Sequence, residues 1–147
     1  MRYGWGVGGV LALAVLAGCA QAPTQDRTMT AGEAVEAASR VNQRGVRGKF
    51  VFEVRAVGTN GQDSFINSEL DYRDPRSLNV RLSPRVRDQL EARLGGKLDQ
   101  VLVGRRVLVT GKAARVRVDL SQGATPIGKF YYQTHVHITA ADQLTLI

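Results

Sequence analysis

The pattern of apolar and polar residues predicts a chain made mostly of short β-strands. Side chains of a strand point alternately to opposite faces, so apolar residues at every second position indicate a strand with one buried face. Asn60-Gly61 separates the first two such segments and is a typical hairpin turn. The pattern predicts five strands, at residues 50–57, 63–67, 78–82, 106–118 and 130–138, before a closing apolar stretch at 144–147.

A short helix is predicted ahead of the first strand, within residues 30–46. Thr30 can cap this helix, and Glu33 three residues later completes the spacing of a capping box. A weak apolar stripe of alanine and valine follows and ends at the polar residues 42–45.

A second helix is predicted between the third and fourth strands. Ser83 is a favourable cap, and Pro84 stands at the first helical position, where its missing N–H costs nothing. Gly95-Gly96 ends the helix. Its apolar face should point inward through Val86, Leu90 and Leu94, which are spaced by four residues.

Three strands, a helix and two further strands, within about a hundred residues, are the plan of the OB-fold. We therefore expect a mainly β protein with a five-stranded Greek-key barrel over residues 47–147, plus the short N-terminal helix. The helix between strands three and four should plug the bottom of the barrel. Gly111 in the long fourth strand predicts a bulge or bend, and residues 119–128 are expected to form a loop.

Two stretches resemble small bacterial OB-fold domains. Residues 65–80, FINSELDYRDPRSLNV, resemble the pattern F-L-N-S-x-x-D-Y-R-D-P-x-x-L-T-V of these domains. Residues 102–112, LVGRRVLVTGK, are similar to the L-x-G-K-x-V-x-V-x-G entry to their fourth strand, with Arg105-Arg106 in place of a single lysine. The resemblance covers roughly residues 47–147 and implies a non-enzymatic binding or scaffolding domain, often exported.

The N-terminal residues resemble the leader of a bacterial lipoprotein. Leu16-Ala17-Gly18-Cys19 has the form of a lipobox and directly follows the apolar run Val10–Leu16. Arg2 supplies the positive charge ahead of this run, which is too short and too rich in glycine for a spanning helix. An ordinary secretory signal that happens to contain a cysteine is the alternative.

The lipoprotein resemblance implies an anchored envelope protein. Residues 1–18 would be a signal peptide, and Cys19 would carry acyl chains such as palmitate on its sulfur and its new amino group. Two or more chains anchor a protein stably. Residues 19–29 would be a flexible tether, and Ala20 after the cysteine favours the outer membrane, with the domain facing the periplasm.

The positive charge of the chain indicates which kinds of partner it could bind. The net charge is +7, with 20 Lys and Arg against 13 Asp and Glu, and arginine predominates. Arginine suits phosphate-bearing partners such as nucleic acid or lipid headgroups. A coding bias that replaces lysine by arginine would produce the same composition without any such partner.

Six side chains are predicted to form one exposed binding face. The fourth and fifth strands of an OB barrel pair antiparallel, so arginines of one should lie beside polar and aromatic side chains of the other. The residues expected to face inward are Phe130, Tyr132, Thr134, Val136 and Ile138. Arginine interleaved with aromatic residues holds single-stranded nucleic acid, although an envelope location disfavours that ligand over an anionic glycan, a lipid headgroup or a protein. The predicted face consists of Arg115, Arg117, Tyr131, Gln133, His135 and His137.

No catalytic arrangement stands out, and no cofactor is expected. The sequence has no glycine-rich phosphate loop, and its one cysteine is assigned to lipidation. His135 and His137 share a strand face and could bind zinc or copper, but no further ligand is evident. The acidic residues between Asn67 and Asp74 could bind calcium. We expect instead a turn held by Asx caps and by a network of Tyr72, Arg73 and a carboxylate, with Asp74-Pro75 starting a tight turn. The histidines are expected to be ordinary surface residues, and the domain a binding or assembly module.

Overall fold

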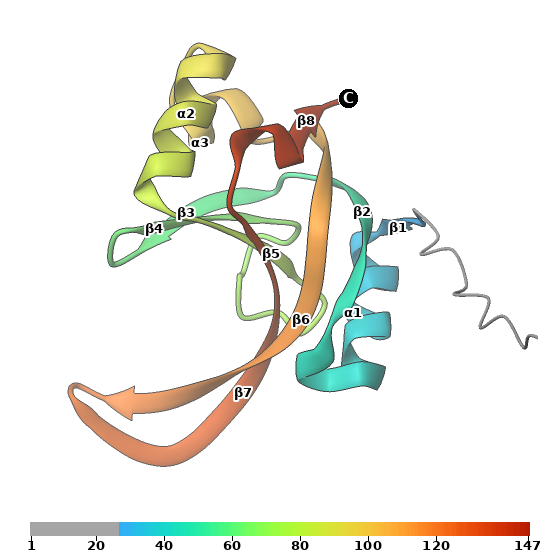
Figure 1. Cartoon of the computed structure of the whole chain (residues 1–147). Coiled ribbons are helices and arrows are strands. Elements are labelled where there is room, and N and C mark those ends of the chain that lie inside the picture. The colour runs from blue at the N-terminus through green and yellow to red at the C-terminus, as the bar shows by residue number, and fades with distance from the viewer. Residues whose placement is uncertain (1–26) are drawn as a thin grey trace, which may run out of the picture.

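The computed structural model describes residues 27–147 (Figure 1). The predicted signal peptide, Cys19 and most of the predicted tether lie outside these residues. Within residues 27–147, no helix combines the length and the hydropathy needed to cross a bilayer.

The described chain is mainly β and forms one open mixed sheet of eight strands. The strands lie in the order β1-β2-β6-β7-β5-β4-β3, and β8 pairs with the free side of β6. Neighbours are antiparallel except β1 with β2 and β5 with β7, which are parallel. The main strands are β2 (Val46–Glu53), β3 (Ala56–Asn60), β4 (Asp63–Asn67), β5 (Leu78–Leu82), β6 (Arg106–Gln122) and β7 (Thr125–Ile138).

The prediction of five strands is wrong, in part because the first predicted strand is two strands. Val54 exchanges backbone hydrogen bonds with the segment before β6, from its N–H to Arg105 (2.9 Å) and from the Gly104 N–H to its carbonyl (2.8 Å). The next residue, Arg55, donates instead to the carbonyl of Asn67 at the end of β4 (2.9 Å). The chain thus changes neighbours between these two residues, and β2 pairs with β6 while β3 pairs with β4.

Two three-residue strands complete the eight. β1 (Thr28–Thr30) pairs with β2 and buries Met29, which is 2% exposed, so the predicted tether ends before Thr28. β8 (Leu144–Leu146) is the predicted closing apolar stretch and pairs with β6. Neither segment is long enough for an alternation of apolar and polar residues to predict a strand.

The N-terminal helix begins as predicted. α1 (Ala31–Val41) is capped by Thr30, whose hydroxyl accepts from the Glu33 N–H while the Glu33 carboxylate accepts from the Thr30 N–H (2.8 Å). A 3₁₀ turn (Asn42–Arg44) follows, and β2 begins at Val46. α1 packs against β2 and β6 through its alanine stripe.

The connection from β5 to β6 contains two helices where one was predicted. α2 (Pro84–Leu94) has the predicted Ser83 cap and ends at Gly95 in the left-handed conformation. Its inward face is confirmed at Val86 and Leu90, which are buried, and Leu94 at the end of the helix is half-buried against the core. α3 (Leu98–Leu102) follows and buries both of its end residues. At five residues, α3 is too short to show helical periodicity.

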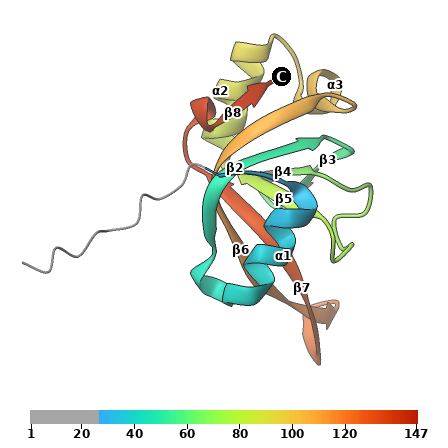
Figure 2. The same cartoon turned by 90° about the vertical axis from the view of Figure 1, so that its right-hand side faces the viewer.

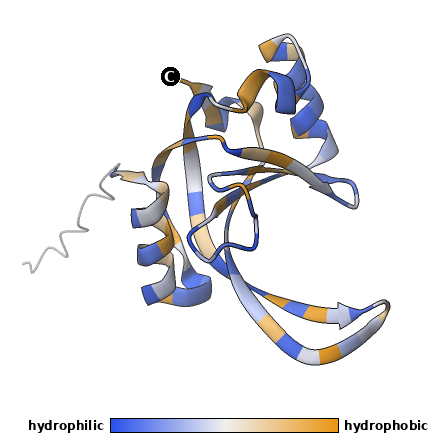
Figure 3. Cartoon of the chain, turned by 180° about the vertical axis from the view of Figure 1, so that it is seen from behind, coloured by the Kyte–Doolittle hydropathy of each residue, from blue (hydrophilic) through white to orange (hydrophobic). Residues whose placement is uncertain are grey.

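β6 and β7 continue past the rest of the sheet as a two-stranded arm, residues 114–133 (Figures 1 and 2). The arm extends from the end of the molecule opposite α2 and α3. The predicted loop at 119–128 is therefore wrong: β6 runs to Gln122, and the turn contains Gly123 at φ +62°. The pairing of β6 with β7 shifts register between Asp119 and Ser121. Figure 3 shows hydrophobic residues interspersed with hydrophilic ones along the arm.

Gly111 does not mark the predicted bulge. It lies directly opposite Gly48 in an unbroken β2–β6 ladder. A Cβ at Gly111 would lie 2.8 Å from Cγ1 of Val136. Close packing of β7 against β6 therefore accounts for this glycine.

Candidate functional site

The structure divides the predicted binding face into two. Arg115 lies opposite Thr134, and Arg117 lies opposite Tyr132. Directly opposite residues of a strand pair share a face, so the arginines do not lie beside Tyr131, Gln133 and His135. This prediction is wrong by one residue of register, which is enough to move a side chain to the other face of the sheet.

One side of the arm is basic and aromatic. The guanidinium carbon of Arg115 lies 3.8 Å from the ring centroid of Tyr132, and that of Arg117 lies 4.1 Å from the ring of Phe130. Phe130 and Tyr132 are 46% and 39% exposed, so the prediction that these two residues face a core is wrong. On the same strand face Thr134, Val136 and Ile138 are buried as predicted, because these residues lie beyond the arm, where β7 also pairs with β5. We call Arg115, Arg117, Phe130 and Tyr132 the cationic face.

The other side of the arm borders a pocket of about 420 Å³, which we call the sheet pocket. β6 and β7 contribute Val118, Tyr131, Gln133 and His135 to its wall. Gly58–Asn60 of β3 form another part. Phe65, Asn67 and Asn79 come from the same face of β4 and β5, and Tyr72 comes from the loop between these strands.

A chain of hydrogen bonds orients the β7 side chains in this pocket. The Nε2 atom of His135 lies 2.6 Å from Oε1 of Gln133, and Nε2 of Gln133 donates to the Tyr131 hydroxyl (2.8 Å). An amide oxygen can only accept, so Nε2 of the neutral imidazole carries the proton. The ring of His135 also meets Phe65 edge-on, with centroids 5.6 Å apart.

Burial determines the protonation of His135. Desolvation, reinforced by the positive charge of Arg81, lowers the pKa of His135 to about 4. Desolvation also raises the pKa of Tyr131. Both groups are therefore uncharged at neutral pH.

The loop after β4 is built on two aspartate turns, one at Asp71 and one at Asp74, where a turn held by such caps was expected. Oδ1 of Asp71 accepts from the N–H of Arg73 (2.9 Å), and Oδ1 of Asp74 accepts from the N–H of Arg76 (2.9 Å). The side chains of the same two arginines pair with these carboxylates. Hydrogen bonds from Arg76 lower the pKa of Asp74 to about 2, and those from Arg73 lower the pKa of Asp71.

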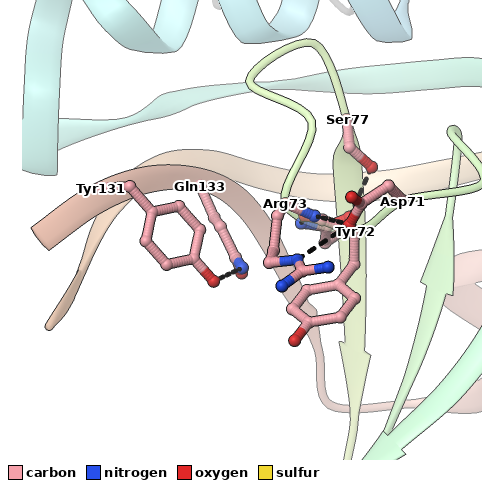
Figure 4. A network of polar contacts seen from close by, with 7 residues as sticks. Asp71, Tyr72, Arg73, Ser77, Tyr131 and Gln133 are labelled. Carbon is pink, nitrogen blue, oxygen red and sulfur yellow. Dashed lines mark hydrogen bonds and ion pairs between the residues drawn. The ribbon is translucent and has the colours of Figure 1, made fainter. Parts of the chain in front are cut away.

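Asn79 holds this loop over the sheet. Its Nδ2 donates to the carbonyl of Tyr72 (3.1 Å), and its Oδ1 accepts from Ser77 (2.6 Å). Figure 4 shows Tyr131 and Gln133 pointing toward the loop that carries Tyr72 and Arg73. The loop leaves Asn79 only 1% exposed, although it lies on the face of β5 opposite Leu78 and Val80.

Asn67 contributes an unsatisfied acceptor to the pocket. Its side chain is 4% exposed, and its Oδ1 has no hydrogen-bond partner among the residues the structure describes. A buried amide oxygen without a partner is uncommon and destabilising, so Asn67 is a candidate ligand contact.

Sequence reasoning missed the contributions of β4, β5 and their loop: Phe65, Asn67, Tyr72 and Asn79. The available signal was the period of two, which places Phe65 and Asn67 on one face of their strand. His137, in contrast, is exposed and does not line the sheet pocket. Within residues 27–147, no three His, Cys, Asp or Glu side chains cluster as metal ligands would.

Comparisons with known proteins add little. No protein-family model matches the sequence, and no curated protein matches it. The fold is similar to the crystal structure of a protein assigned as an aspartyl-tRNA synthetase from Leishmania major Friedlin, with 10% sequence identity and a TM-score of 0.41. That match covers 86% of this chain and 22% of the other, so the chain spans about a fifth of its length, and the likeness supports no functional argument.

Proposed function

We propose that this chain is a lipid-anchored envelope protein whose β-domain is a non-enzymatic binding module, with the sheet pocket as its ligand site. The observation that carries the proposal is the convergence of aromatic and amide side chains from several strands and one loop on a single concavity. A pocket with a few converging polar groups is the usual form of a ligand site.

The strand order supports an OB-fold plan for this module. If β2 and β3 are counted as one bent first strand, then β4, β5, β6 and β7 are the second to fifth strands. Their order across the sheet is then first, second, third, fifth and fourth, and the fourth strand pairs again with the first. The third and fifth strands of that plan, β5 and β7, are parallel. OB-folds bind ligands on the face of their second and third strands, here β4 and β5, where the sheet pocket lies.

The chemistry of the pocket favours binding over catalysis. His135 is a weak base, because burial lowers its pKa to about 4, and its Nε2–H is donated to the amide oxygen of Gln133. No carboxylate, serine or cysteine is among the described residues that line the pocket. A nucleophile paired with a base would be needed for covalent catalysis.

A thermal-shift panel tests the pocket as a ligand site. We expect at least one of a set of neutral oligosaccharides, oligonucleotides and peptides to raise the Tm of the full chain purified in detergent, because ligands stabilise the state they bind. Gly58→Val should abolish that shift, since a Cβ at Gly58 would meet nothing within 4 Å and its side chain would enter the pocket.

Gly32→Ala is the matched control. Gly32 also has no atom within 4 Å of an added Cβ, but it lies on α1, away from the pocket. The ligand-induced shift should survive in this variant. Equal shifts in wild type and Gly58→Val would rule out the pocket as the site.

The cationic face supports a second candidate function, the binding of an anionic polymer. Arg115 stacked on Tyr132 and Arg117 stacked on Phe130 combine charge with aromatic surface, as in proteins that bind single-stranded nucleic acid. Retention on heparin should then fall steeply with salt and be lost in the double variant Arg115→Gln/Arg117→Gln. Tyr131→Phe, on the opposite face, should leave retention unchanged. Salt-insensitive retention would contradict this function.

A further inference from the structure

We infer that the ligand of the sheet pocket is an uncharged saccharide, bound by at least one sugar ring. This inference rests on the proposed function of the pocket as a ligand site, and it adds the chemical class of the ligand. It follows from the charge, the hydrogen-bonding groups and the shape of the pocket.

The lining of the pocket carries no charge, although the chain has 20 lysines and arginines. Every described side chain that lines it is aromatic, amide, hydroxyl or aliphatic, apart from the neutral His135. The nearby Arg81 is already bound to Asp63 (2.7 Å), and Arg73 is bound to Asp71 (3.2 Å). A charged ligand would lose its hydration here without gaining a counter-charge, which is costly.

The polar groups of the pocket match a hydroxyl. Oδ1 of Asn67 needs a donor, since nothing described bonds to it. The Tyr131 oxygen already accepts from Gln133, so its own O–H remains to be donated. A hydroxyl group both donates and accepts, so the hydroxyls of a sugar ring have the chemistry that each of these groups needs.

The remaining surface suits the apolar faces of such a ring. Tyr72 is half exposed above the pocket, and Phe65 and Tyr131 are partly exposed in its wall. Tyrosine combines an apolar ring with a polar tip, which suits ligands that are themselves part apolar and part polar. The volume of about 420 Å³ is within the range of small-molecule sites, and Gly58 leaves part of it open.

A nucleotide is less well matched, because its base could stack in the pocket but its phosphate would have no partner there. The two arginines that stack on aromatic rings, Arg115 and Arg117, lie on the opposite side of the arm. Base recognition and phosphate neutralisation are combined on one surface in proteins that bind single strands.

Calorimetric titration of the full chain in detergent tests the class of ligand. The probes are chitotriose and maltotriose, which are uncharged, and a short oligothymidylate, which is anionic. We expect at least one sugar to bind with an affinity that changes less than about twofold between about 50 and 500 mM salt, because no counterions are released. Gly58→Val and Asn67→Leu should each weaken this binding at least about tenfold, and Gly32→Ala should not.

Three outcomes would overturn the inference. If only the oligothymidylate binds and Gly58→Val abolishes its binding, the pocket remains a ligand site but its ligand is not a saccharide. Sugar affinity that is unchanged in Gly58→Val would place the sugar elsewhere. Failure of all three probes, while a peptide from the thermal-shift panel still binds in a Gly58-dependent way, would assign the pocket to protein partners. Gly58→Val keeps the test valid if Asn67→Leu does not fold.

Discussion

At the scale of the residue, environment rather than type decides what a side chain can do. His135 and His137 stand two positions apart on one face of β7, yet His137 is exposed, whereas burial lowers the pKa of His135 to about 4. Its neutral ring is then available for one fixed hydrogen bond, to Gln133 (2.6 Å). A sequence pattern shows that the two histidines share a face, but not that Phe65 of β4 packs against only one of them.

The depressed pKa of His135 predicts a pH-dependent stability. The unfolded chain takes up this proton near pH 6.5 and the folded chain only near pH 4, so the free energy of unfolding falls as the pH drops through that interval. In urea denaturation, His135→Gln should lose less stability than wild type between these pH values, by about 1–2 kcal/mol once partial solvent exposure is allowed for. Parallel pH profiles for the two proteins would contradict the assigned burial.

At the scale of the element, β5 shows how a strand's outer face can be buried in one half and exposed in the other. Its core side carries Leu78, Val80 and Leu82, all fully buried as the alternation predicts. Its other side carries Asn79 under the loop and Arg81 in solvent. The loop makes the difference, because Asn79 bonds to it at Tyr72 and Ser77.

The two outer residues of β5 should therefore differ in their effect on stability. Asn79→Ala should cost about 1–3 kcal/mol, because it leaves buried hydrogen-bonding groups without partners. Arg81→Ala should cost about 0–1 kcal/mol, since it removes only a partly exposed ion pair with Asp63. Midpoints of denaturant unfolding compare the two directly. A larger loss in Arg81→Ala would show that the loop does not hold Asn79 as described.

At the scale of the whole molecule, the arm separates two kinds of chemistry. Its cationic face has charge and exposed aromatic rings, and its other face borders a neutral pocket. A strongly basic chain can in this way contain a site for an uncharged ligand, because side chains on opposite faces of a two-stranded ribbon point away from each other. The two proposed binding activities should respond independently to substitution.

The proposed anchoring is also a property of the whole molecule and depends on Cys19. Cys19→Ser should prevent acylation, so the protein should either keep its signal peptide or be released as a soluble species. Fractionation with immunodetection of the processed and unprocessed sizes distinguishes these cases. Ala20→Ser, which leaves the cysteine in place, is the control. A processed Cys19→Ser protein that remains in the membrane fraction would contradict the lipid anchor.

Local signals were sufficient for the elements whose cause is local. The cap at Ser83, the spacing of Val86 and Leu90, and the period of two in residues 63–67 and 78–82 all predicted what the structure contains. The arm was missed because its sequence contains Gly123 and Gly128, and glycine is as common in loops as in the turns of hairpins. The break after Val54 was missed because its backbone is satisfied by the segment before β6, a partner distant in sequence.

The sequence by itself thus determined the main strands, the two longer helices and the inward faces of β5 and α2, since these depend on hydrophobic periodicity and capping within a few residues. Tertiary structure decided the register of β6 against β7, the covering of Asn79 and His135, and so the composition of the sheet pocket. Register is a relation between residues far apart in the chain. A shift of one residue exchanges the two faces of a strand, and for that reason five of the six predicted site residues became parts of two surfaces, while His137 belongs to neither.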